Sequence, residues 1–203
     1  SGGWALTGNL NTTPANNYLG TADNQPLELK VNGTRGLRIE PTPTNGAVNV
    51  VGGSRTNRVE GGAIGATIGG GGAVEYSQIV DEMQQQLGGP NVVGADFGTV
   101  GGGLQNRVEN GALGGGIASG AFNSVSNSAV GFIGGGFQNR IENAPNAFIG
   151  GGDHNMIANS FSESASTPEG AVIPGGRGNR VSGRYSFAAG RSAEAAHDNT
   201  FVW

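Results

Sequence analysis

The sequence predicts an all-β fold, a parallel β-roll or β-helix solenoid in which short strands stack coil upon coil. A nine-residue phrase occurs five times along the chain, and 41 of the 203 residues are glycine. Valine or isoleucine stands at fixed offsets from these glycines. A short phrase that recurs while its surroundings vary is the signature of a solenoid. The alternative, a disordered glycine-rich tract, would not need β-branched residues at fixed positions.

The repeated phrase is predicted to form a strand, a corner and a second strand. It opens with an apolar residue and a Gly-rich triplet, and it closes with Asn, one free position, and Val or Ile. The β-branched residues favour strands, and the glycines permit a tight corner. The Asn can bond nearby backbone or stack on the Asn of the next coil. The copies occupy residues 51–59, 100–108, 133–141, 149–157 and 173–181.

Two sets of repeat residues carry the structural prediction. The asparagines are expected to form a buried ladder, and the second residue of each triplet is expected at a corner with positive φ where coils come closest. The variant Gly135→Val should therefore not fold stably. Valine is disfavoured at positive φ, and its methyl groups would crowd the neighbouring coils. The residues are Asn57, Asn106, Asn139, Asn155, Asn179, Gly102, Gly135, Gly151 and Gly175.

The spacing of the repeat asparagines predicts the size of one coil. Successive asparagines are 49, 33, 16 and 24 residues apart. The shortest interval is then one coil and the interval of 33 is close to two coils. Within that interval, residues 113–116 and 122–125 look like a stretched copy of the phrase. The two remaining intervals must contain decayed coils, insertions, or both.

Residues 1–45 are predicted to form an N-terminal β cap, and residues 46–203 the solenoid. Apolar and polar residues alternate over 26–31 and 37–40, on either side of Asn32-Gly33, which is a hairpin signal with a slightly long loop. Two strands alone are marginal in water, so the hairpin should pack on another surface.

A helix is predicted to interrupt the solenoid at about residues 75–88. Acidic residues stand early in this stretch and Gly-Gly-Pro ends it. We expect its apolar face to dock on the coils, with a partner-binding helix as the alternative. The apolar residues at helical spacing are Tyr76, Ile79, Val80, Met83 and Leu87. Further on, residues 161–170 are predicted to form a polar, exposed loop that tolerates deletion.

Composition restricts the function classes. The net charge of −4 argues against a nucleic-acid or anionic-membrane partner. The absence of cysteine excludes disulfides and thiolate metal sites, and no apolar run is long enough to span a membrane. Aromatic residues make up only 6% of the chain. This shortage of bulky apolar material favours a core built by stacking, together with association of several chains.

Most of the chain resembles trimeric autotransporter adhesin heads and bacterial and phage fibre proteins. Residues 186–195 (SFAAGRSAEA) resemble the S-x-A-x-G-x-x-A-x-A repeat of those heads, and the interval of 16 residues matches their one-coil repeat. Residues 18–33 resemble a segment of bacterial and phage fibre proteins, and residues 197–203 are similar to what precedes their self-cleaving chaperone domain. The resemblance implies a homotrimer of left-handed parallel β-rolls, located outside the cell or on a virion or cell surface. The expected helix and the irregular spacings depart from the pattern of the heads.

Few residues are candidates for chemistry. His154 follows Asp153, and three copies of it on a trimer axis could hold a metal; the simpler interpretation is a solvent-facing turn residue. Asp81 and Glu82 are the best candidates for the pair of carboxylates that cleaves a glycosidic bond. The side chains of adjacent residues on a helix point in different directions, however, which argues against such a pair. No recognisable nucleophile motif stands near His197. No cofactor or metal is therefore expected.

An arginine follows the repeat Asn in four copies, at Arg58, Arg107, Arg140 and Arg180. In three of them a glutamate comes two residues later, at Glu60, Glu109 and Glu142. Stacked coils would align these residues on one face. They would form either a ladder of exposed ion pairs, which we favour, or a strip for an anionic sugar.

The sequence thus predicts a structural module, without enzymatic activity, of a tail fibre or surface adhesin. Its partners would be further copies of itself and a surface receptor or glycan. The alternative from another class is a β-helix enzyme that degrades polysaccharides, which should show a cleft with convergent carboxylates and aromatic platforms. A passive ice-binding surface would need a flat, regular array of threonines, and the sequence shows none.

Overall fold

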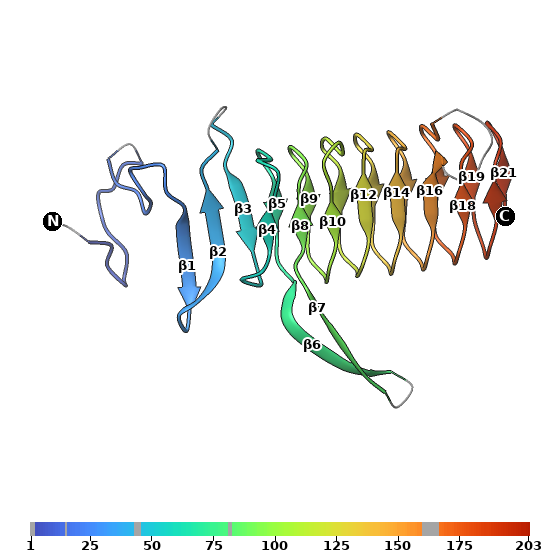
Figure 1. The fold of residues 1–203 in the computed structure, drawn as a ribbon. Helices are drawn as coiled ribbons and strands as arrows, with labels where there is room; N and C mark the ends of the chain where they lie inside the picture. Colours follow the sequence, from blue (N-terminus) through green and yellow to red (C-terminus); the bar gives the residue numbers. More distant parts are fainter. Residues whose placement is uncertain (1–2, 15, 43–45, 81–82, 160–166) are drawn as a thin grey trace.

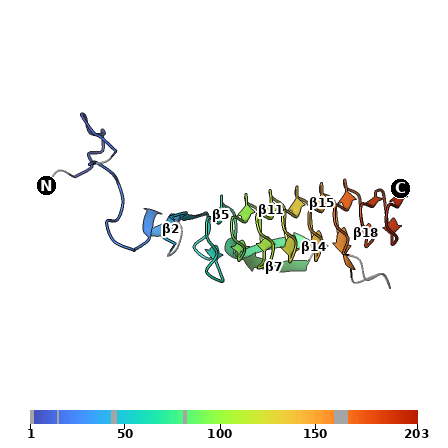
Figure 2. The ribbon, with the colours of Figure 1, turned by 90° about the horizontal axis from the view of Figure 1, so that it is seen from above.

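The computed structural model describes residues 3–14, 16–42, 46–80, 83–159 and 167–203. Its main body is an all-β parallel solenoid of about eight turns, which confirms the predicted fold class. The coils stack along one axis, so that the solenoid is an elongated rod (Figures 1 and 2). The described residues contain no α-helix, and thus none that could cross a membrane.

Each turn contributes one short strand to each of two sheets, which we name sheet A and sheet B, and the solenoid strands within each sheet are parallel. Sheet A contains, in order along the rod, β3 (Asn49–Gly52), β5 (Thr67–Ile68), β9 (Thr99–Val100), β11 (Gly116–Ile117), β13 (Phe132–Ile133), β15 (Phe148–Ile149), β17 (Val172–Ile173), β19 (Phe187–Ala188) and β21 (Phe201–Val202). Sheet B contains β4 (Arg58–Val59), β8 (Val92–Val93), β10 (Arg107–Val108), β12 (Ser124–Ser126), β14 (Arg140–Glu142), β16 (Met156–Ala158), β18 (Arg180–Val181) and β20 (Glu194–Ala195).

The core of the rod is narrow because each strand sends one residue inward. Side chains alternate across a strand, so Ile133 of β13 is buried while its neighbour Phe132 faces outward. Ile141 of β14 fills the core from sheet B. Small residues such as Ala144 and Ala147 close the corner between the sheets. Two large apolar residues a turn are therefore enough, which explains how a glycine-rich chain fills its interior.

The predicted N-terminal hairpin is confirmed, with a shorter loop than expected. Strands β1 (Leu27–Val31) and β2 (Thr34–Glu40) are antiparallel and join through Asn32 and Gly33, both at positive φ. Strand β2 also pairs antiparallel with β3, so the hairpin covers the N-terminal edge of sheet A. A hydrogen bond from Arg38 lowers the pKa of the Glu28 carboxyl on the facing strand.

The predicted helix at about 75–88 is wrong. Strands β6 (Ala73–Val80) and β7 (Met83–Gly89) pair antiparallel, and the resulting hairpin projects from the rod (Figure 1). The stretch opens with Val74, Tyr76 and Ile79, and β-branched and aromatic residues favour a strand over a helix. Over so short a stretch, the spacing of the apolar residues alone does not distinguish a helix from a strand. Asp81 and Glu82 lie outside the described residues.

The polar loop predicted at 161–170 lies mostly outside the described residues, and its tolerance to deletion stays a prediction. The strands on either side of it remain in step, because β15 pairs with β17 and β16 pairs with β18. The longer interval between Asn155 and Asn179 is therefore one coil with an insertion.

Candidate functional site

Seven buried asparagines lie in a row along one corner of the rod, which we name the asparagine ladder. The five repeat asparagines of the sequence belong to it, and Asn91 and Asn123 complete it. The sequence indicated Asn123 only as part of a stretched copy of the phrase, because Ala118-Ser119-Gly120 replaces the Gly-rich triplet before it. Asn91 was missed because it directly follows the hairpin insertion. Their spacing of 15, 17 and 16 residues from the neighbouring ladder members was the available signal. The full set is Asn57, Asn91, Asn106, Asn123, Asn139, Asn155 and Asn179.

Each ladder amide joins its own coil to the next one. The Oδ1 atom of Asn139 accepts a hydrogen bond from the backbone N–H of Asn155, at 3.0 Å. Its Nδ2 atom donates to the carbonyl of Gly135 in the same corner and to that of Gly152 in the next, both at 2.9 Å. These bonds satisfy a polar side chain that is fully buried. The ladder therefore fixes both the corner and the coil-to-coil register.

The reasons expected for the second triplet glycine are wrong. Gly135 has no positive φ, and a Cβ added there would meet no atom closer than the carbonyl of Ser119, at 3.9 Å. The constraint falls on its neighbours: a Cβ on Gly134 would lie 2.3 Å from the Gly150 oxygen. Gly136 has φ +87°, and its Cβ would lie 2.1 Å from the Gly152 oxygen. The equivalent residues Gly102, Gly151 and Gly175 are as open as Gly135.

The arginines and glutamates of sheet B form exposed ion pairs. The N–O distances are 2.6 Å for Arg58–Glu60, 3.1 Å for Arg107–Glu109 and 2.7 Å for Arg140–Glu142. Arg107 also reaches Glu60 of another turn, at 3.6 Å. Arg180 lies on the same column, in register with Met156 and Glu194. Exposed pairs of this kind contribute little each, so they shape the surface charge more than the stability.

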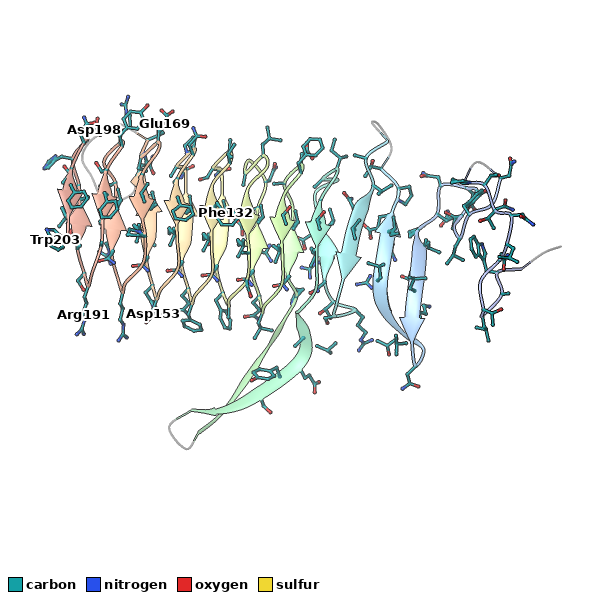
Figure 3. All side chains as sticks on the ribbon, turned by 180° about the vertical axis from the view of Figure 1, so that it is seen from behind. Phe132, Asp153, Glu169, Arg191, Asp198 and Trp203 are labelled. Carbon is teal, nitrogen blue, oxygen red and sulfur yellow. The ribbon has the colours of Figure 1, made fainter. Side chains whose placement is uncertain are left out.

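His154 is exposed, and its Nδ1 atom contacts the Asp153 carboxylate. Asp153 also pairs with Arg177 of the next turn, at 3.1 Å. Asp153 and Arg191 lie along the edge of the rod from which the hairpin projects (Figure 3). Within the described ranges, no three His, Cys, Asp or Glu side chains come together in a way that could hold a metal.

An open apolar groove of about 510 Å³ lies between the projecting hairpin and the glycine corners. Tyr76 of β6 lines one side, and Leu104, Phe122 and Phe137 line the other. The rings of Phe122 and Phe137 meet edge to face, with centroids 5.4 Å apart. Among the residues that the structure describes, those lining the groove include no acidic side chain. Sequence analysis missed this groove because it placed a helix where the hairpin is.

Comparison with known proteins finds no matching family model and no matching curated protein. The resemblance to fibre and adhesin proteins therefore rests on the short segments at 18–33, 186–195 and 197–203.

Proposed function

We propose that this chain is a structural module of a tail fibre or surface adhesin, assembled as a homotrimer outside the cell or on a virion surface. The observation that carries the proposal is the unbroken asparagine ladder from Asn57 to Asn179. The ladder continues through the hairpin insertion, where Asn57 bonds the backbone of Asn91. A rod whose coils are locked to one another along its length is suited to hold other parts of a fibre at a fixed distance.

The arrangement of acidic residues favours this role over polysaccharide cleavage. A glycoside hydrolase needs two carboxyl groups that face each other across the scissile bond. Here Glu60, Glu109 and Glu142 each pair with an arginine on the outside of sheet B. The described residues that line the apolar groove beside the hairpin include no carboxylate. A surface receptor or glycan as the partner of the fibre remains part of the proposal.

Deleting one coil tests the proposal, because a spacer depends on its length and not on any one coil. Removal of residues 124–139 takes out one repeat of 16 residues and places Asn123 directly before Arg140, in step with the ladder. We expect this variant to fold, to assemble and to form a shorter rod in electron micrographs. Removal of half that coil (124–131) is the control, and it should prevent folding because it brings a sheet A strand against sheet B.

The result that would contradict the proposal is release of reducing ends from a panel of polysaccharides by the intact protein. Failure of the in-step deletion to fold, with no difference from the half-coil deletion, would also contradict it.

A further inference from the structure

The outer face of sheet A carries no charge in the part of the solenoid that the structure describes. Sheet B, by contrast, presents Arg58, Arg107, Arg140 and Glu194 at its outward positions. The outward residues of sheet A are Val50, Thr67, Thr99, Gly116, Phe132, Phe148, Val172, Phe187 and Phe201. Charge is therefore confined to one of the two sheet faces.

The last five of these residues form an outward-facing apolar stripe, which we name the aromatic stripe: Phe132, Phe148, Val172, Phe187 and Phe201. Figure 3 shows Phe132 on the broad face of the rod, between its two edges. Phe132, Phe148 and Phe201 are exposed, at 40%, 41% and 68%, whereas Val172 and Phe187 are half-buried. These values are high for large apolar side chains that lie next to one another. A contiguous exposed apolar surface of this kind marks an interaction site.

The face around the aromatic stripe is long, and small residues lie beside most of its rings. The residue after each inward isoleucine or alanine is small, at Gly134, Gly150, Pro174 and Ala189. On that flank the large side chain is Trp203, which follows Val202 at the end of the stripe and is exposed. Strands about 4.8 Å apart give sheet A a solenoid face about 40 Å long. The backbone bonds between coils run from the Gly131 carbonyl to the Gly134 N–H, which gives a width of about 13 Å. The resulting area of about 500 Å² is of the same order as the roughly 800 Å² that each partner buries in a standard interface.

We propose that this face of sheet A is the surface through which copies of the chain pack on one another, side by side and with equivalent coils at the same level. The inference rests on the proposed function, since it names the face that joins the subunits. A second copy fits the stripe because its own coils repeat at the same spacing. An uncharged face also brings no like charges together around a symmetry axis.

A sugar fits the stripe less well than another copy of the chain does. Sugars stack on exposed ring faces, whereas Phe187 and Phe201 stack on each other, with centroids 4.4 Å apart and planes 9° apart. Phe132 and Phe148 are also parallel, with an interplanar angle of 6°. Rings stacked along the rod present their edges outward, and such edges can fit between side chains of a facing protein surface.

Phe148→Glu tests the proposal, with Met156→Glu as the matched control at an outward position of sheet B. The glutamates of neighbouring copies would repel one another at position 148, whereas at position 156 the new glutamate would lie in register with Arg140 and Arg180. Light scattering should give the assembled mass for the wild type and for Met156→Glu. It should give the chain mass of 20.3 kDa for Phe148→Glu, with an unchanged circular dichroism spectrum. An assembled, folded Phe148→Glu would overturn the proposal, while a monomeric wild type would overturn the proposed trimer itself.

A second pair of variants keeps the test decisive if Phe148→Glu does not fold. The chain has no cysteine, so Phe148→Cys and Met156→Cys each introduce a single thiol. A short bismaleimide should link the copies of Phe148→Cys in high yield and those of Met156→Cys poorly. Equal yields from the two variants, or a higher yield from Met156→Cys, would show that the copies do not meet through sheet A.

Discussion

Replacing Asn139 with alanine is expected to lower the free energy of unfolding by about 3 kcal/mol, because a buried polar group left without a partner costs about 1–3 kcal/mol. The substitution removes the acceptor of the Asn155 backbone N–H and the donor to the Gly135 and Gly152 carbonyls. Several buried groups therefore lose a bond at once. Denaturant unfolding followed by circular dichroism measures the change.

Asn146→Gly in the same coil is the control for this substitution. Asn146 is exposed and has φ 57°, a backbone conformation that glycine adopts without strain. Its unfolding midpoint should stay close to that of the wild type. Equal losses in the two variants would mean that the asparagine ladder does not hold the coils together.

The second large effect is expected at the third glycine of a triplet. Gly103 has φ +84°, and an added Cβ would lie 2.0 Å from the Gly120 oxygen and 2.7 Å from Nδ2 of Asn106. Gly103→Ala must therefore push two coils apart and disturb the ladder, at a cost of about 4 kcal/mol or more. We expect little soluble protein and a much lower thermal midpoint.

Gly102→Ala is the matched control, one residue away in the same corner. Gly102 has no positive φ, and a Cβ added there meets no atom within 4 Å. Its stability should remain within about 0.5 kcal/mol of the wild type. A Gly102→Ala variant as damaged as Gly103→Ala would show that the corner geometry described above is wrong.

The period of the fold was predictable from sequence because glycine, asparagine and β-branched residues each have a strong local preference. Val or Ile at the inward position and Asn four residues after the middle glycine are enough to indicate a coil. Asn91 was not predicted, and Asn123 was predicted only as part of a stretched copy, because the corner tolerates other residues in place of the Gly triplet. What the fold requires there is an amide that reaches two carbonyls, and a Gly triplet is only one way to supply them.

Features that depend on how coils stack could not be predicted from local preference. The middle glycine was expected to be the constrained one, yet the close approach falls on Gly134 and Gly136, since it depends on where the carbonyls of the next coil point. The aromatic stripe appears only when the coils are in register, because Phe148 and Phe187 are separated by an insertion. The apolar residues of the hairpin at 73–89 fit the spacing of a helix as well as that of a strand, and its β-branched and aromatic residues were the only local signal for a strand.

The mass of the intact protein in solution tests the account most directly. Light scattering at micromolar concentration should give three times the chain mass of 20.3 kDa, independent of dilution over the range measured, because the subunits of a fibre remain associated. A particle of 20.3 kDa would contradict the account, since it would leave the aromatic stripe exposed and the proposed fibre module without its partner copies.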